Sequence, residues 1–270
     1  MAEITLRDGT DLHYELAGDG EPLVLIHGGF TESLTWEQSL PGLAARFRVV
    51  AYDRRAHGLS GAGTGERSVR GDVADLAELV ERIDLGPVHV ASFSYGAVVA
   101  MALAVERPEL VRRVAAHEPP LLGALAGRDE HAEVLANVME AYAAVRALLE
   151  DGEDERGAAL FVDTAIGPGT WASLPPEARA RFVQHAPAFL ADLRDPDTVL
   201  GMDVEPFLSL DRPLLLTYGG ETPPMYVAIC DVLAEALPHA RLHTFDSAGH
   251  VPHVSHPEDY VAVTSGFLTA

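Results

Sequence analysis

Lysine is absent from this chain of 270 residues, and all 19 of its basic residues are arginine. The chain carries 41 acidic residues, which gives a formal net charge of −22. Nucleic acids and anionic membrane surfaces would repel a protein of this charge, so we expect neither as a partner. We interpret the missing lysine as a genomic bias and attach no mechanism to it.

Cysteine is nearly absent as well. Cys230 is the only one, so the chain cannot form an internal disulfide, and its apolar neighbours predict a buried thiol. The sequence also lacks an apolar run of membrane-spanning length, and no basic segment precedes an apolar run at its start. We therefore expect a cytoplasmic protein.

The sequence does contain a regular alternation of short apolar strands and helical patterns. An opening hairpin is predicted around Asp8-Gly9, and Ser68 is a good cap for a helix. This alternation predicts an α/β domain whose mainly parallel sheet has helices on both faces. The predicted strands are 4–6, 12–16, 23–26, 47–52, 88–91, 111–116, 213–218 and 240–245, and the predicted helices are 31–45 (capped by Thr31 or Ser33), 68–83, 95–107, 224–237 and 257–268.

The alternation stops between residues 121 and 210. Helical patterns cover 130–149 and 176–193, and no convincing strand lies between them. The acidic run at 150–155 reads as a solvated turn. We predict a core made of residues 1–120 and 211–270, with residues 121–210 inserted as a helical cap.

A serine lies where one predicted strand meets the following helix. The stretch Val88–Ala97 reads V-H-V-A-S-F-S-Y-G-A, which places Ser94 on a tight turn. Small residues two before and two after such a serine allow strand and helix to pass closely, and here they are Ser92 and Gly96. This geometry is typical of a nucleophile.

An activated serine needs a base and a carboxylate that orients this base. His250 is the candidate base, because it follows the last predicted strand in a loop of small residues. It has no partners at the spacing of a metal site, and the His27-Gly28-Gly29 loop lacks the lysine of a phosphate-binding loop. The sequence therefore predicts neither a metal nor a cofactor.

Five features follow one another along the chain: the His27-Gly28-Gly29 loop, the Asp53–Gly58 motif, the serine turn, the cap and Gly249-His250. In this order they resemble the α/β-hydrolase superfamily. The resemblance covers nearly the whole chain. It implies an eight-stranded, mostly parallel sheet, a Ser-acid-His triad and an oxyanion hole of two backbone amides. Carried over by position, those amides are Gly29 and Tyr95, Phe30 forms a wall of the acyl pocket, and His27, Asp53 and His57 brace loops.

The acid departs from the common pattern. The resemblance places an aspartate at position 222, which is Thr222 here, so Glu221 and Glu118 remain as candidates. Glu118 ends the strand beside the nucleophile strand, where some haloalkane dehalogenases and zearalenone-type lactonases of this superfamily carry their acid. We favour Glu118, because the strand beside the nucleophile strand brings its carboxyl end near the same histidine. Pro119 and Pro120 restrict the backbone of Glu118 and favour one fixed direction for it.

A serine at position 94 favours acyl chemistry over the alkyl-enzyme chemistry of relatives with an aspartate there. We expect a hydrolase that cleaves an ester or lactone of a small apolar molecule, with Trp171 among the cap residues that contact it. Three alternatives stay open: hydrolysis of a carbon–carbon bond, a cofactor-free perhydrolase or cyclase, and a ligand-binding protein without turnover. The sequence also leaves a homodimer open.

Overall fold

Eight strands form one sheet in the order β1-β2-β4-β3-β5-β6-β7-β8 in the computed structural model, which describes residues 2–64, 67–195 and 200–270. β2 pairs antiparallel with β1 and with β4, and every other neighbouring pair is parallel. This confirms the expected eight-stranded, mostly parallel sheet. The strands are β1 Ala2–Thr5, β2 Asp11–Ala17, β3 Glu21–Ile26, β4 Phe47–Tyr52, β5 Val88–Phe93, β6 Val111–His117, β7 Leu214–Gly219 and β8 Arg241–Phe245.

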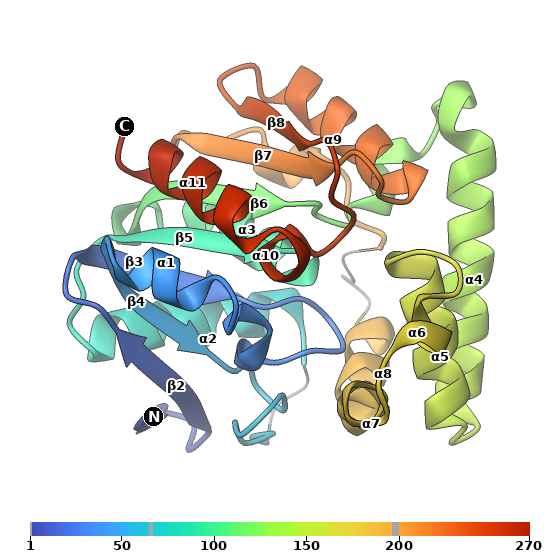
Figure 1. The fold of residues 1–270 in the computed structure, drawn as a ribbon, viewed down its shortest axis with the longest axis horizontal. Helices are drawn as coiled ribbons and strands as arrows, with labels where there is room; N and C mark the ends of the chain where they lie inside the picture. Colours follow the sequence, from blue (N-terminus) through green and yellow to red (C-terminus); the bar gives the residue numbers. More distant parts are fainter. Residues whose placement is uncertain (1, 65–66, 196–199) are drawn as a thin grey trace.

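The sheet is buried on both faces. Successive side chains of each inner strand point to opposite sides, so each of these strands contributes to two apolar clusters. In β3, Leu23 and Leu25 join one apolar cluster, whereas Val24 and Ile26 join the other. The first cluster lies under α1 (Leu40–Ala44) and α11 (Pro257–Leu268), which are in front of the sheet in Figure 1. The second lies under α2 (Val69–Arg82), α3 (Tyr95–Glu106) and α9 (Pro224–Ala236).

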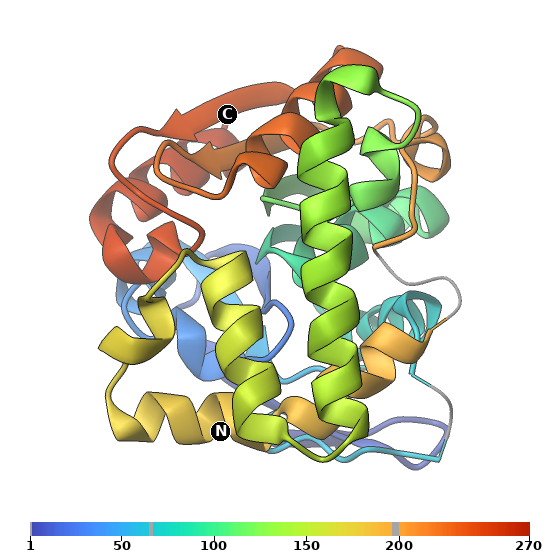
Figure 2. The same cartoon turned by 90° about the vertical axis from the view of Figure 1, so that its right-hand side faces the viewer.

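Between β6 and β7 the described residues form helices and no strand. These helices gather at one end of the sheet and form a separate wall (Figures 1 and 2). We use the word cap for this segment. Its helices are α4 Ala132–Glu150, α5 Asp154–Ala165, α6 Thr170–Ser173, α7 Pro176–Gln184 and α8 Ala186–Arg194, accompanied by short 3₁₀ turns at Leu122–Leu125, Asp129–His131 and Glu205–Phe207.

Buried ion pairs tie the cap helix α8 to the core. Asp192 of α8 receives a hydrogen bond of 2.5 Å from Arg67, and its other oxygen lies 3.7 Å from Arg54. Arg54 also binds Asp72 of α2 at 2.7 Å. Because a buried ion pair is costly to break once formed, this cluster fixes where α8 lies on the core.

Prolines explain two helices that the sequence pattern misplaced. The predicted helix 31–45 is wrong: a 3₁₀ turn spans Ser33–Trp36, and α1 begins only at Leu40. The predicted helix 176–193 is likewise divided into α7 and α8 at His185. Pro41 and Pro187 each lie in the first turn of the second helix, the part of a helix that tolerates a residue without an N–H.

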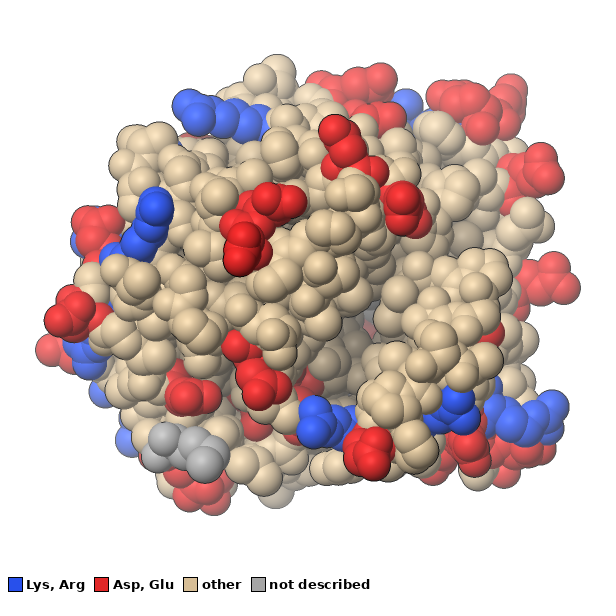
Figure 3. Space-filling model, viewed as in Figure 1, with Lys and Arg blue, Asp and Glu red and all other residues tan. Residues whose placement is uncertain are grey.

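Charge is spread over the molecular surface. In Figure 3 acidic side chains are scattered over the face shown, and the surface is hollowed between the core and the cap. None of the helices in the described ranges is both long enough and apolar enough to cross a membrane.

Candidate active site

Ser94 lies on the turn between β5 and α3 and has a strained backbone. Its φ and ψ are 53° and −130°, a region that non-glycine residues rarely adopt. Its amide donates a hydrogen bond of 2.8 Å to the carbonyl of His117 at the end of β6. Backbone strain of this kind costs on the order of 1–3 kcal/mol and persists where surrounding contacts enforce it, as at many functional sites.

Gly96 allows this turn to form. A Cβ at position 96 would lie 2.5 Å from the carbonyl oxygen of His27 and 2.6 Å from that of Ile26, both of them backbone atoms. Ser92, on the other side of Ser94, is tolerated because its buried hydroxyl donates to the carbonyl of Ala115 at 3.2 Å. The missing first glycine of the motif therefore does not prevent the turn.

We expect Gly96→Ala to destabilise the protein by roughly 1–3 kcal/mol, because the added methyl group forces β3 and α3 apart. Urea denaturation with far-ultraviolet circular dichroism measures this change. Gly266→Ala is the matched control, since a Cβ at this helical glycine meets nothing within 4 Å. Equal stability of the Gly96→Ala variant and the wild type would contradict this account of the turn.

The imidazole of His250 is held by Glu118. His250 lies in the loop after β8, and its Nδ1 is hydrogen-bonded to Oε2 of Glu118, which follows β6 directly. Glu118 has a φ of 48° and is fully buried. Its Oε1 accepts a hydrogen bond from the amide of Gly219 at 2.7 Å, and its Oε2 accepts one from the hydroxyl of Thr222 at 2.9 Å.

Glu221, the other candidate acid, is exposed to solvent. Its amide donates to the carbonyl of Ala248 at 3.0 Å, and its carboxylate has no hydrogen bond to His250 in the part of the chain that the structure describes. The structure thus brings Glu118, and not Glu221, to the histidine.

Glu118 remains an anion despite its burial. Burial alone would raise the pKa of its carboxyl, but His117, the hydrogen bond from His250 and the amide of Gly219 hold that pKa below its usual value. Burial lowers the pKa of His117 to about 4, so His117 is neutral at pH 7. At neutral pH the hydrogen bonds therefore do most to keep Glu118 charged.

Tyr226 of α9 lies beside the histidine. Its hydroxyl is 3.4 Å from Nε2 of His250, and the side chains of Ser94 and Tyr142 lie close enough to it to affect its pKa. No direct hydrogen bond joins Ser94 and His250 within the described ranges. No sequence pattern points to Tyr226, because a tyrosine in the first turn of an amphipathic helix is typical of an ordinary core residue.

The two residues of the predicted oxyanion hole lie at the same cavity as Ser94. Gly29 and Tyr95 both line it, and neither amide has a hydrogen-bond acceptor among the residues that the structure describes. Free amides beside a nucleophile are suited to stabilise an oxyanion. Asp53 joins the loop that carries Gly29 to the loop after β4, because its carboxylate accepts from the amides of Ser33 at 2.7 Å and Leu59 at 2.9 Å.

The cavity at Ser94 offers only about 20 Å³ of free space, and cap residues form much of its wall. Phe30 is not among its lining residues: it packs behind the wall, with ring centroids 4.7 Å from Phe161 and 4.3 Å from Phe189. Trp171 does not line the cavity either and packs against Phe182 on the cap. Besides Gly29, Ser94 and Tyr95, the lining consists of Pro120, Tyr142, Phe161, Phe189, Asp192, Leu193 and Leu200.

His117, Glu118 and His250 have ligand atoms within 4.8 Å of one another, so the three side chains have the spacing of a metal site. The sequence did not predict this group, although His117 ends β6 directly before Glu118. Hydrogen bonds already engage both oxygens of Glu118 and Nδ1 of His250. This bonding suits a hydrogen-bonded acid and base better than a set of metal ligands.

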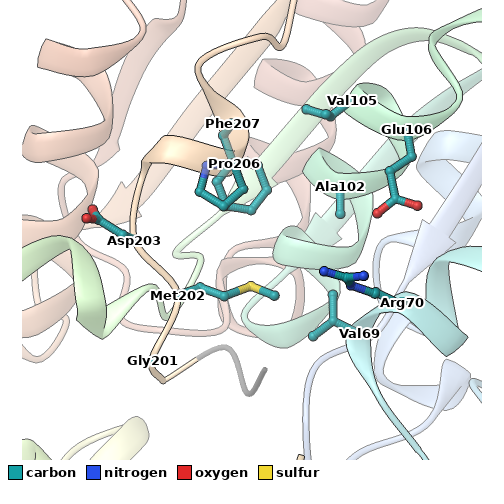
Figure 4. Close-up of a pocket in the computed structure, with 10 residues that line it drawn as sticks. All are labelled: Val69, Arg70, Ala102, Val105, Glu106, Gly201, Met202, Asp203, Pro206 and Phe207. Atoms are coloured by element: carbon teal, nitrogen blue, oxygen red, sulfur yellow. The ribbon is translucent and has the colours of Figure 1, made fainter. Parts of the chain in front are cut away.

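A second, larger cavity of about 370 Å³ lies away from Ser94 (Figure 4). It lies between the start of α2, the end of α3 and the segment that returns from the cap. None of the predicted site residues lines it. The lining residues are Val69, Arg70, Ala102, Val105, Glu106, Gly201, Met202, Asp203, Pro206 and Phe207.

Comparison with known proteins agrees with this geometry. The chain is 28% identical to a putative carbamate hydrolase, RutD, of Azorhizobium caulinodans, over 95% of this chain and 94% of that protein. It is 25% identical to a pimeloyl-[acyl-carrier protein] methyl ester esterase of Vibrio parahaemolyticus, over 96% and 98% of the two chains. The crystal structure of an enol-lactonase from Burkholderia xenovorans LB400 has the same fold, with a TM-score of 0.80, 20% identity and full coverage of both chains. The profile of the alpha/beta hydrolase family matches residues 23–263, and the chain belongs to this family.

Proposed function

We propose that the protein is a serine hydrolase that cleaves an ester or a lactone of a small, fairly apolar molecule through an acyl-enzyme. Ser94 attacks the carbonyl carbon, and His250 accepts the proton of the serine and returns it to the leaving oxygen. Glu118 orients His250, and the amides of Gly29 and Tyr95 stabilise the oxyanion. Water then releases the acyl group by the same steps.

The observation that carries this proposal is the buried hydrogen bond between Glu118 and Nδ1 of His250. It fixes the tautomer in which Nε2 carries the lone pair that can accept a proton. The aromatic walls of the cavity, Phe161 and Phe189, favour an apolar acyl group.

We expect a fluorophosphonate to add one adduct to the wild type and none to Ser94→Ala, measured by intact mass. The phosphorus reagent requires an activated hydroxyl next to an oxyanion hole. Ser92→Ala is the matched control and should still be labelled, since the Ser92 hydroxyl is buried and bonded to Ala115. An adduct retained in Ser94→Ala would contradict the assignment of the nucleophile.

A panel of p-nitrophenyl esters, lactones, carbamates and β-diketones separates the alternative reactions. Turnover of short esters or lactones supports acyl-oxygen cleavage, and turnover of β-diketones alone supports hydrolysis of a carbon–carbon bond. The carbamates are included because one relative is named as a putative carbamate hydrolase. Peroxide-dependent turnover alone would indicate a perhydrolase, and tight binding without turnover would indicate a receptor.

A further inference from the structure

The ring of Tyr226 lies against the imidazole of His250. The two ring centroids are 4.3 Å apart, and the planes differ by 13°. Tyr226 is fully buried, so its ring has little freedom to move. The histidine is therefore held in two ways, by a hydrogen bond at Nδ1 and by a parallel ring on its face.

The hydroxyl of Tyr226 lies beside both reacting atoms of the proposed mechanism. It is 3.4 Å from Nε2 of His250, and the side chain of Ser94 lies close enough to it to affect its pKa. Because Nδ1 donates its proton to Glu118, Nε2 is an acceptor, and the Tyr226 hydroxyl is the donor toward it.

A leaving oxygen must occupy nearly the same region. When the tetrahedral intermediate collapses, this oxygen is still bonded to the carbon that Ser94 has attacked, and it takes its proton from Nε2 of His250. It therefore lies within reach of Oγ of Ser94 and of Nε2 of His250, which are the two groups beside the Tyr226 hydroxyl. The hydroxyl and the leaving oxygen are then neighbours.

We propose that Tyr226 is a catalytic residue whose hydroxyl donates a hydrogen bond to the leaving oxygen, which suits the site to esters and lactones of basic, aliphatic alcohols. The proposal rests on the serine hydrolase function proposed above. In the step concerned, the bond from Oγ of Ser94 to the carbonyl carbon has formed and the bond from this carbon to the leaving oxygen breaks. The proton that Ser94 gave to His250 passes to that oxygen, and Tyr226 keeps its own.

Two properties of the surroundings support this role. Burial raises the pKa of Tyr226 well above 10, so the side chain stays a neutral donor at any working pH. The side chain of Tyr142, on the cap helix α4, also lies close enough to this hydroxyl for each tyrosine to affect the pKa of the other. The cap thereby takes part in the placement of a donor at the reaction centre.

The leaving group's basicity provides the test. A p-nitrophenolate departs without help, whereas an alkoxide needs a proton and a hydrogen bond. We expect Tyr226→Phe to lower kcat/KM for ethyl butyrate by about 10- to 100-fold and for p-nitrophenyl butyrate by less than about threefold, in line with the loss of one donor at a developing charge. The phenylalanine keeps the ring against His250, so only the hydroxyl is removed.

Tyr260→Phe is the control, because Tyr260 is a buried tyrosine of the opposite apolar cluster and should leave the ratio of the two rates unchanged. Equal losses for both esters in Tyr226→Phe would overturn the proposal, since a purely structural role predicts them. If Tyr226→Phe does not fold, Tyr142→Phe, which removes the hydroxyl beside that of Tyr226, must shift the ratio in the same direction. A wild type that reacts with neither ester nor fluorophosphonate would contradict the serine hydrolase function itself, whereas labelling at Ser94 with an unchanged ratio contradicts only the role of Tyr226.

Discussion

Replacing Glu118 by glutamine is expected to lower kcat by roughly three to four orders of magnitude, the scale seen when the orienting acid of a triad becomes an amide. The carboxylate accepts hydrogen bonds from His250, from the amide of Gly219 and from the hydroxyl of Thr222. A glutamine has one acceptor oxygen for these three donors, and its other terminal group is an NH₂. At least one of the three donors then faces this NH₂ group, which is itself a donor. The imidazole then loses the tautomer that leaves Nε2 free to accept a proton.

Steady-state turnover of the most rapidly cleaved p-nitrophenyl ester, together with the rate of labelling by a fluorophosphonate, measures this loss. Glu221→Gln is the matched control: its carboxylate is exposed, so we expect turnover within about threefold of the wild type. Loss of activity in Glu221→Gln alone would show that the acid comes from the loop after β7. Circular dichroism of both variants separates a chemical loss from unfolding.

The protein is also expected to lose stability steeply below pH 6.5, because four fully buried histidines are neutral in the fold. Burial lowers the pKa of His27, His57 and His253 well below the usual value and lowers that of His117 to about 4. The bonding agrees: Nε2 of His27 accepts the amide hydrogen of Arg54 at 2.9 Å, which requires a neutral ring.

The direction of this pH effect follows from the protonation of the histidines in the folded and in the unfolded chain. In the unfolded chain these rings take up protons near pH 6.5, whereas the folded rings resist protonation, so the free energy of unfolding falls as the pH falls through 6.5 toward the folded values. Each histidine contributes about 1.4 kcal/mol between pH 7.5 and 5.5. Burial raises the pKa of Asp192 to about 6, which acts in the opposite sense and offsets part of the loss. A net decrease on the order of 4 kcal/mol remains.

Urea denaturation at pH values from 7.5 to 5.5 tests this dependence. His253→Asn should reduce the slope of stability against pH by about a quarter, because it removes one of the four groups. His239→Asn, at an exposed position, should leave the slope unchanged. A stability that does not vary over this range would mean that the buried rings protonate without cost.

The strands of the sheet were predictable, and the reason is physical. β3, β5 and β6 are buried on both faces, so each appears in the sequence as a short, nearly continuous apolar run. The cap was harder: α5 begins within the acidic run, which was read as a turn, and it buries Phe161 and Val162 only because α4 and α8 lie beside it. Such packing between helices has no short-range signal in the sequence.

The site was predictable in part, by the same logic. Ser94 and His250 follow strands, and a residue that directly follows a parallel strand must lie at the edge of the sheet where ligands bind. The sequence left Glu118 and Glu221 both open, because each follows a neighbouring strand and the choice depends on the direction of a side chain. Phe30 and Trp171 were expected to contact the substrate, yet one packs behind the cavity wall and the other lies away from it.

The residue at position 222 is linked to the residue at position 118. Thr222 stands where the resemblance places an aspartate, and its hydroxyl donates to the carboxylate of Glu118. Thr222 and the histidine therefore meet at the same oxygen, Oε2 of Glu118, and positions 118 and 222 follow two adjacent strands. Two carboxylates there would repel each other, and two donors would leave His250 without an acceptor. The two positions, on two strands, therefore form one electrostatic site, in which one residue must be the acid and the other a hydrogen-bond donor. If the acid is replaced by a donor at one position, the donor must be replaced by an acid at the other.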